Sequence, residues 1–528
     1  MAASLVIRGG QVLDGLGGRP VRADVAVAGQ AIVAIGQDLD TGDAEVLDAG
    51  GCVVAPGFVD IHAHGDVYGL ACPGAAARLH EGVTAELVGN CGDSPFPQTD
   101  EMLAERAGDA GRFGVAVDWR TLDDFAARHQ AVGSAIHRGS MVGHATVRRA
   151  IMGEVARAPS PDELDAMARE VETAMEAGAF GLSSGLIYAP GMYADRAELE
   201  ALCRVVRRRG GFYSSHLRDE GREVEAAVEE LIAVGRRTGV RLQYSHAKVA
   251  GPRNWHKADR VIGRLKDVRA GGLDIACDRY PYAASSTSLS ALLPGWVREG
   301  GEAMFRRLAE PHSRARIVAE LEAVRRTEAD WERVLLARAG GERWRHAEGR
   351  TVRQAAREAG IRPADLVVEL LLAGRARASI VLFSMREENL LKWLRLPFVA
   401  VGSDGATRAI DGPTAEGKPH PRSYGSFARF LGRYVRERGL VSLAEGVRRI
   451  TSLPASWMGL RRRGVLRPGA FADVTVFDPA AIADRATYQH PQQYSVGVRH
   501  VVVDGRVALA AGRPTGALAG RFLRRGSE

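Results

Sequence analysis

Two histidines one residue apart, His62 and His64, directly follow a short apolar run over residues 58–61. The run begins after Pro56-Gly57, a turn signal, and its residue types are typical of a β-strand. Side chains two apart on a strand point to the same face, so the two imidazoles can converge on one point. Paired neutral imidazoles suit a borderline metal ion such as zinc, and the pair therefore indicates a metal site.

Three more potential metal ligands stand at the ends of apolar runs. Cys91 follows the run 82–88 in a glycine turn, His216 ends the run 211–216, and His246 ends the run 242–246. Each of them alone is also compatible with a structural role, as a packed cysteine or a core histidine. Together they supply three ligands and leave a vacancy for water, which is the arrangement of catalytic zinc. Zinc lowers the pKa of its bound water to about 7 and so makes hydroxide available at neutral pH.

Asp404 ends another apolar run, over residues 398–403. An isolated carboxylate at the end of a buried strand is costly unless it pairs with a cation or binds a metal. We expect Asp404 to accept a proton from the water and to return it to a leaving nitrogen, as a single general base and acid. These residues together predict metal-assisted hydrolysis of an amide-like bond.

The elements that must position these side chains alternate between strand and helix. Ser160-Pro161-Asp162-Glu163 combines an N-cap serine, a proline at the first helical position and a capping-box glutamate, and strand 180–184 follows that helix. A second helix over 223–238 precedes strand 241–245. Eight such units fit between about residues 57 and 460, which favours an α/β fold of the (β/α)8 TIM-barrel type, whose catalytic groups lie at the C-terminal strand ends.

Both ends of the chain are β-rich. Short strand-like runs separated by glycine turns occur over residues 4–55 and again over 472–509. Each half is too short to bury a core alone, so we expect one small β-sandwich domain built from both termini. The predicted domains are 1–56 (sandwich, first part), 57–464 (barrel) and 465–528 (sandwich, second part). A polar insertion near 290–350 is either a lid over the barrel mouth or exposed decoration.

The overall composition sets limits on location and partners. The 528 residues are 46% hydrophobic and 26% charged, as in a folded globular enzyme, and the net charge of +7 comes mainly from scattered arginines. No aromatic-interleaved basic stripe accompanies them, so we expect no nucleic-acid partner. Five cysteines without paired spacing, no evident signal peptide and no apolar run of membrane-spanning length predict a cytoplasmic protein with no membrane association.

The motifs resemble the amidohydrolase superfamily and, within it, the D-aminoacylases (N-acyl-D-amino-acid deacylases), over nearly the whole chain. The resemblance rests on His62-Ala63-His64, Gly89-Asn90-Cys91-Gly92, the segment 185–191, the segment 278–287, and Gly402-Ser403-Asp404-Gly405. Strand four, Gly181-Leu182-Ser183-Ser184, lacks the lysine that is often carboxylated and bridges two metals in the superfamily, and the resemblance to the D-aminoacylases implies that Cys91 takes that place. The resemblance implies one tight zinc on Cys91, His216 and His246, and a weaker second site at His62, His64 and Asp404.

The same resemblance implies a pocket for the α-carboxylate of the substrate. The residues that it assigns to this pocket are Lys248, Tyr280, Ser286 and Arg422. A bidentate arginine with lysine and hydroxyl donors is chemically suited to a carboxylate. The implied function is hydrolysis of N-acyl-D-amino acids, which are small-molecule substrates.

Two segments of the sequence depart from the family pattern. At Asp93-Ser94, relatives usually carry a more apolar residue at the first of the two positions. In Val142-Gly143-His144-Ala145, alanine replaces the second glycine of the family, so His144 either lies near the site or has a structural role.

The same metal centre could instead hydrolyse a cyclic amide or imide, or a dipeptide that contains a D-amino acid. The chain could also be a metal-bearing binding protein without activity, which the intact ligand set and Asp404 make a weaker interpretation.

Overall fold

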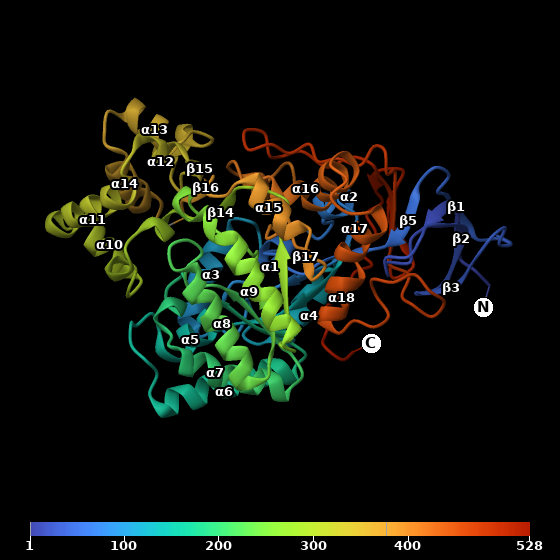
Figure 1. The fold of residues 1–528 in the computed structure, drawn as a ribbon, viewed down its shortest axis with the longest axis horizontal. Coiled ribbons are helices and arrows are strands. Elements are labelled where there is room, and N and C mark those ends of the chain that lie inside the picture. Colours follow the sequence, from blue (N-terminus) through green and yellow to red (C-terminus); the bar gives the residue numbers. More distant parts are fainter. Residues whose placement is uncertain (1, 376, 528) are drawn as a thin grey trace.

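The computed structural model describes residues 2–375 and 377–527 and has a parallel β-barrel at its centre (Figure 1). Its strands are β6 (Phe58–Asp60), β7 (Val83–Val88), β8 (His137–Ser140), β9 (Val142–Gly143), β10 (Gly181–Gly185), β11 (Phe212–His216), β12 (Arg241–Tyr244), β13 (Ile275–Arg279) and β17 (Val399–Val401). β8 and β9 are separated only by Met141 and form one position, so the barrel has eight positions. The bridge between Ala63 and Gly405 closes β17 onto β6.

Helices cover the outside of the barrel, as in repeated strand–helix units. They are α1 (Asp66–Ala71), α2 (Ala76–His80), α3 (Asp100–Gly111), α4 (Leu122–Val132), α5 (His144–Met152), α6 (Pro161–Glu176), α7 (Arg196–Arg208), α8 (Val224–Thr238), α9 (Ala258–Ala270), α15 (Glu387–Leu394), α16 (Arg422–Arg429), α17 (Leu443–Ile450) and α18 (Ser452–Met458). The capping box expected at residue 160 is present, because Ser160 accepts from the Glu163 amide and Glu163 from the Ser160 amide. This pair satisfies two amides that the first helical turn leaves without partners.

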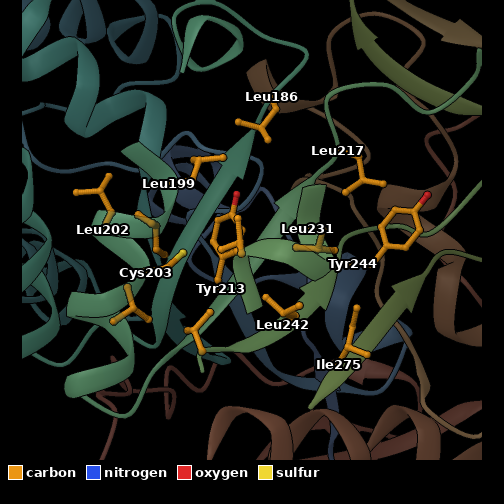
Figure 2. Close-up of a cluster of buried hydrophobic side chains, with 14 of the residues drawn as sticks. Leu186, Leu199, Leu202, Cys203, Tyr213, Leu217, Leu231, Leu242, Tyr244 and Ile275 are labelled. Atoms are coloured by element: carbon orange, nitrogen blue, oxygen red, sulfur yellow. The ribbon is translucent and has the colours of Figure 1, made fainter. Parts of the chain in front are cut away.

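Apolar side chains fix these helices against the strands. Figure 2 shows Leu199, Leu202 and Cys203 of α7 beside Tyr213 of β11, all of them almost fully buried. In the same cluster, Leu231 of α8 lies near Leu242 and Tyr244 of β12. The apolar faces of α7 and α8 therefore pack against the barrel strands.

The two ends of the chain share one nine-stranded sheet beside the barrel. Its strands are β1 (Leu5–Val12), β2 (Val21–Ala28), β3 (Ala31–Gly36), β4 (Glu45–Asp48), β5 (Val53–Pro56), β18 (Val474–Phe477), β19 (Val498–Val503), β20 (Arg506–Ala510) and β21 (Arg513–Pro514). β5 pairs antiparallel with β18, which joins the N-terminal and C-terminal strands directly. Strands from both ends of the chain thus form one sheet, as expected from the sequence.

The segment from β14 to β16, between β13 and α15, forms a separate layer, at the upper left of Figure 1. It contains β14 (Ser285–Ser288), α10 (Glu302–Ala309), α11 (Pro311–Val324), α12 (Glu328–Glu332), β15 (Val334–Arg338), α13 (Val352–Ala359), α14 (Pro363–Gly374) and β16 (Ser379–Leu382). A hydrophobic core of its own holds the helices together. The insertion is therefore longer than the 290–350 expected, and it is a packed unit.

Within the described ranges, no helix has the length and apolar character that crossing a bilayer requires.

Candidate metal centre

The expected metal ligands all lie at the C-terminal ends of barrel strands. His216 is the last residue of β11, His246 follows β12 by two residues, and Cys91 follows β7 by three. All three line one cavity of about 970 Å³ at the mouth of the barrel. The barrel brings these three residues together although Cys91 and His246 are 155 positions apart in the chain.

Cys91, His216 and His246 form a compact cluster whose ligand atoms lie within 4.8 Å of one another. His246 Nε2 lies 2.9 Å from His216 Nδ1 and 3.5 Å from the Cys91 sulfur. A thiol and two imidazoles are typical zinc ligands, and the three-ligand set leaves a coordination position open. The donor types and their convergence fit a zinc ion.

His62, His64 and Asp404 form a second cluster, which shares Cys91 with the first. His64 Nε2 lies 3.0 Å from Asp404 Oδ1, and His62 Nε2 lies 3.4 Å from the Cys91 sulfur. Cys91 is thus the residue common to both clusters.

The electrostatics of the clusters favour the metal-binding form of the cysteine. Burial raises the pKa of the Cys91 thiol, but the neighbouring His62 and His246 more than offset this and hold the pKa well below its usual value. The thiolate is the form that binds metals.

Three of these residues have a backbone conformation that non-glycine residues rarely adopt. The φ angles of Cys91, His246 and Asp404 are +53°, +38° and +50°. Such conformations cost about 1–3 kcal/mol each and persist where the surrounding structure holds them. The strain turns each side chain from its strand end toward the common cavity.

Buried polar contacts hold the turn that carries Asp404. The Ser403 amide donates to Asp60 Oδ1 at 2.9 Å, and a guanidinium nitrogen of Arg78 donates to the Gly405 carbonyl at 2.8 Å. The Asp404 amide donates to the His62 carbonyl at 2.7 Å. The Asp404 turn and the His62 strand end are thereby fixed relative to each other.

Two carboxylates that the sequence did not predict as site residues lie beside His62 and His246, next to the ring nitrogens that face away from Cys91. Asp278 Oδ1 lies 2.9 Å from His62 Nδ1, and Glu220 Oε1 lies 3.2 Å from His246 Nδ1. Asp278 could have been found by the same signal as Asp404, because it follows the apolar run 275–277 of a barrel strand. Glu220 lies in a loop, and nothing in its local sequence indicated a role.

The four residues expected to bind a carboxylate line the same cavity as the clusters. Arg422 donates to the Ser286 carbonyl at 3.3 Å, and its guanidinium carbon lies 4.9 Å from the centre of the Tyr280 ring. The Tyr280 hydroxyl is buried and has no hydrogen-bond partner among the described residues. Lys248 is buried beside Tyr280, with its amine 6.0 Å from the ring centre. Buried donors that converge on a cavity are suited to an anionic ligand.

The two departures from the family pattern have different outcomes. Asp93 lines the cavity and forms a 3.2 Å ion pair with Arg106, whereas His144 is fully buried outside it. His144 Nε2 lies 2.7 Å from Glu198 Oε1, and Gly143 caps the helix that begins at His144. These contacts describe a structural role for His144.

Comparisons with known proteins agree with this fold and cavity. The model of the amidohydrolase family matches residues 45–509. The chain is 38% identical to N-acyl-D-glutamate deacylase of Alcaligenes xylosoxydans xylosoxydans, over 99% of this chain and 96% of that protein.

Two solved structures are similar over nearly their whole length. N-acyl-D-glutamate deacylase from Bordetella bronchiseptica, in complex with zinc and a phosphonate that mimics the tetrahedral reaction intermediate, has a TM-score of 0.82 and 34% identity, covering 99% of this chain and 100% of that one. A D-aminoacylase from work on its binuclear metal centre, described as showing one-metal activation and second-metal attenuation, has a TM-score of 0.82 and 32% identity, with the same coverage of 99% and 100%.

The chain therefore belongs to the amidohydrolase family and, within it, to the D-aminoacylase branch. It is a hydrolytic enzyme of that family. The resemblance noted in the motifs and the (β/α)8 fold expected from the strand–helix alternation are both confirmed.

Proposed function

We propose that this enzyme hydrolyses the amide bond of N-acyl-D-amino acids and releases a carboxylate and a free D-amino acid. One observation carries the proposal: a single cavity is lined by the cluster of Cys91, His216 and His246, by Asp404, and by four side chains with donor groups, which are Lys248, Tyr280, Ser286 and Arg422. In a linear N-acyl amino acid, the scissile amide and the α-carboxylate are both attached to the α-carbon. The substrate can therefore reach the metal cluster with its amide and the donor side chains with its carboxylate at the same time. The relatives named above act on substrates of this class.

Cys91, His216 and His246 would hold one tightly bound zinc. His62, His64 and Asp404, with the shared Cys91, would form a weaker second site. Zinc, when bound, activates water and polarises the amide carbonyl. The related D-aminoacylase is described as activated by one metal ion and attenuated by a second. This description supports the proposal of one tight site and one weaker site.

The protein's own residues would orient the substrate and move the proton. Asp404, held by His64 at 3.0 Å, accepts the proton of the attacking water on its carboxylate and returns it to the leaving nitrogen. Lys248, Tyr280, Ser286 and Arg422 bind the α-carboxylate and so set the amide in front of the metal ligands. Fixing the amide, the α-carboxylate and the side chain at three points distinguishes D from L substrates.

We also propose a preference for acidic side chains. Arg298 and Arg325 line the cavity, and neither has a carboxylate within ion-pair distance among the described residues. Arg298 donates to the Ile187 carbonyl at 2.5 Å, and Arg325 lies 5.4 Å from the Trp331 ring centre. Arginines without a carboxylate partner are available to a second carboxylate of the substrate. The similarity to N-acyl-D-glutamate deacylases agrees with this preference.

All five cysteines are free, which supports the proposed cytoplasmic location, because reducing compartments keep thiols unpaired.

Zinc analysis combined with a screen of paired N-acetyl D- and L-amino acids tests the function. We expect about one tightly bound zinc per chain and turnover confined to the D series, fastest for D-glutamate or D-aspartate. Turnover of cyclic imides with none of the N-acetyl D-amino acids would replace the proposal with the cyclic-amide alternative.

A further inference from the structure

Glu220 faces both proposed subsites of the cavity at once. It lies in the loop after β11, four residues beyond His216, and its side chain is only 12% exposed. Its carboxylate forms an ion pair with Lys248 and lies 3.2 Å from His246 Nδ1 and 3.5 Å from His216 Nε2. Three side chains, one from the end of β11 and two from the loop after β12, therefore surround one carboxylate.

The two imidazole nitrogens that face Glu220 are the ones that point away from the ligand cluster. Within the cluster, His216 Nδ1 and His246 Nε2 lie 2.9 Å apart. A neutral imidazole that binds a metal through one nitrogen carries its proton on the other. His216 Nε2 and His246 Nδ1 then become donors, and each needs an acceptor to hold the ring in place.

Only a group that has acceptors and no donors can accept hydrogen bonds from both imidazole N–H groups and from the Lys248 ammonium. Lys248 lies 2.6 Å from His246 Nδ1, but an ammonium is a donor and cannot accept from a protonated imidazole nitrogen. A carboxylate has two oxygens with about four acceptor positions, enough for two imidazoles and one ammonium. A glutamine has one acceptor oxygen and an NH₂ group that would face a donor.

We propose that Glu220 is a positioning residue that fixes His216 and His246 in their metal-binding tautomers and at the same time holds Lys248 at the α-carboxylate subsite. This inference rests on the proposed function, because it takes the cluster as the zinc site. It adds that metal binding and substrate binding depend on one shared side chain. Loss of the carboxylate would weaken both, although Glu220 itself is expected to touch neither zinc nor the reacting amide.

The test compares Glu220→Gln, Glu220→Asp and Glu223→Gln with the wild type. Glu223 lies in the same loop, is exposed, and pairs with Arg222 at the surface, so it is a matched control for the loss of one carboxylate. The affinity of metal-free enzyme for zinc is measured by competition with a chelator, and KM and kcat are measured on an N-acetyl D-amino acid. Circular dichroism and thermal melting report the folded state.

We expect Glu220→Gln to raise the Kd for zinc by about 10–100-fold, the usual effect of removing a partner of a ligating histidine. KM should rise as well, by about 10-fold, because Lys248 loses the group that holds it. Glu220→Asp keeps an acceptor-only group and should give smaller increases in both. Glu223→Gln should equal the wild type in both measurements.

The outcomes separate this inference from the function on which it rests. A wild type without zinc affinity or deacylase activity overturns the proposed function first. If the wild type binds zinc but Glu220→Gln leaves either the Kd for zinc or KM unchanged, the double role of Glu220 is overturned and the proposed function stands. If Glu220→Gln changes the melting temperature without changing the Kd or KM, Glu220 is a merely structural residue. If Glu220→Gln does not fold, Glu220→Asp decides, since its shorter side chain must withdraw from at least one donor and raise the Kd or KM.

Discussion

The guanidinium of Arg422 lies 2.7 Å from the carboxylate of Asp404. The residue proposed to bind the substrate's α-carboxylate thus contacts the residue proposed to move the proton. Burial would raise the pKa of Asp404, but Arg422 and the neighbouring histidines hold it well below its usual value. An incoming α-carboxylate competes with Asp404 for the same guanidinium, so substrate binding and the basicity of Asp404 are linked through Arg422.

Replacing this arginine tests the α-carboxylate subsite. Arg422→Met removes a charge-assisted hydrogen bond worth about 2 kcal/mol, so KM for an N-acetyl D-amino acid should rise about 30-fold. The corresponding substrate with a carboxamide in place of the carboxylate should show a much smaller change. Equal losses on the two substrates would mean that Arg422 supports the cavity and does not read the carboxylate.

Asp404 can be separated from the tight metal site. Asp404→Asn should keep the zinc held by Cys91, His216 and His246 but lose about 10²–10⁴-fold in kcat, because the amide cannot accept the proton. Zinc content and kcat are measured on the same preparation. Loss of zinc together with activity would make Asp404 a structural ligand of the tight site.

Cys91 should control both metal clusters. Cys91→Ala removes the sulfur common to the two ligand sets, so we expect the variant to be purified with little zinc and no activity. Circular dichroism should show an intact fold, because Cys91 lies in a turn beyond β7 and not in the barrel strand itself. Unchanged zinc content would exclude Cys91 from the site. Treatment of the wild type with a chelator should abolish activity, and added zinc should restore it.

The arginine at position 298 should determine the preference between side chains. Arg298→Met removes a cation from the cavity wall and should lower kcat/KM for N-acetyl-D-glutamate by about 10-fold or more, with little change for N-acetyl-D-leucine. Arg325→Met should act in the same direction if both arginines face the substrate side chain. A uniform loss on both substrates would remove Arg298 from side-chain recognition.

His129 predicts a loss of stability in acid. Burial, with the charges of Arg138 and His137, lowers the pKa of this histidine to about 3 from its ordinary value of 6.5. The unfolded chain binds a proton below pH 6.5 whereas the folded chain does not, so stability is complete above 6.5 and is lost as the pH falls toward about 3. Each pH unit in that window costs up to about 1.4 kcal/mol.

His129→Gln keeps an acceptor for Arg138, which lies 3.0 Å from His129 Nε2, and removes the titrating group. Urea unfolding at about pH 7 and about pH 5 should show a free-energy loss smaller by about 2 kcal/mol in the variant. His256→Gln, at an exposed position, should match the wild type. Identical pH dependence in His129→Gln and the wild type would show that His129 is not the titrating group.

Local sequence signals were sufficient to identify the barrel and most of the candidate site. An apolar run that ends on histidine or aspartate marks a strand whose last side chain reaches the barrel mouth, and this rule identified His216 and Asp404. The same periodicity indicated the helices on the outside and a β unit at each end of the chain. These features are encoded within about ten residues, so they can be read before the chain folds.

Other relationships exist only because the chain closes on itself. The ion pair of Arg422 with Asp404, the convergence of three donors on Glu220, and the pairing of β5 with β18 join residues whose positions depend on loop paths and on barrel closure. Spacing along the chain carries no information about such contacts. The sequence by itself thus determined which residues could do chemistry and on which fold, whereas the tertiary structure decided which of them share one cavity and which carboxylates hold them there.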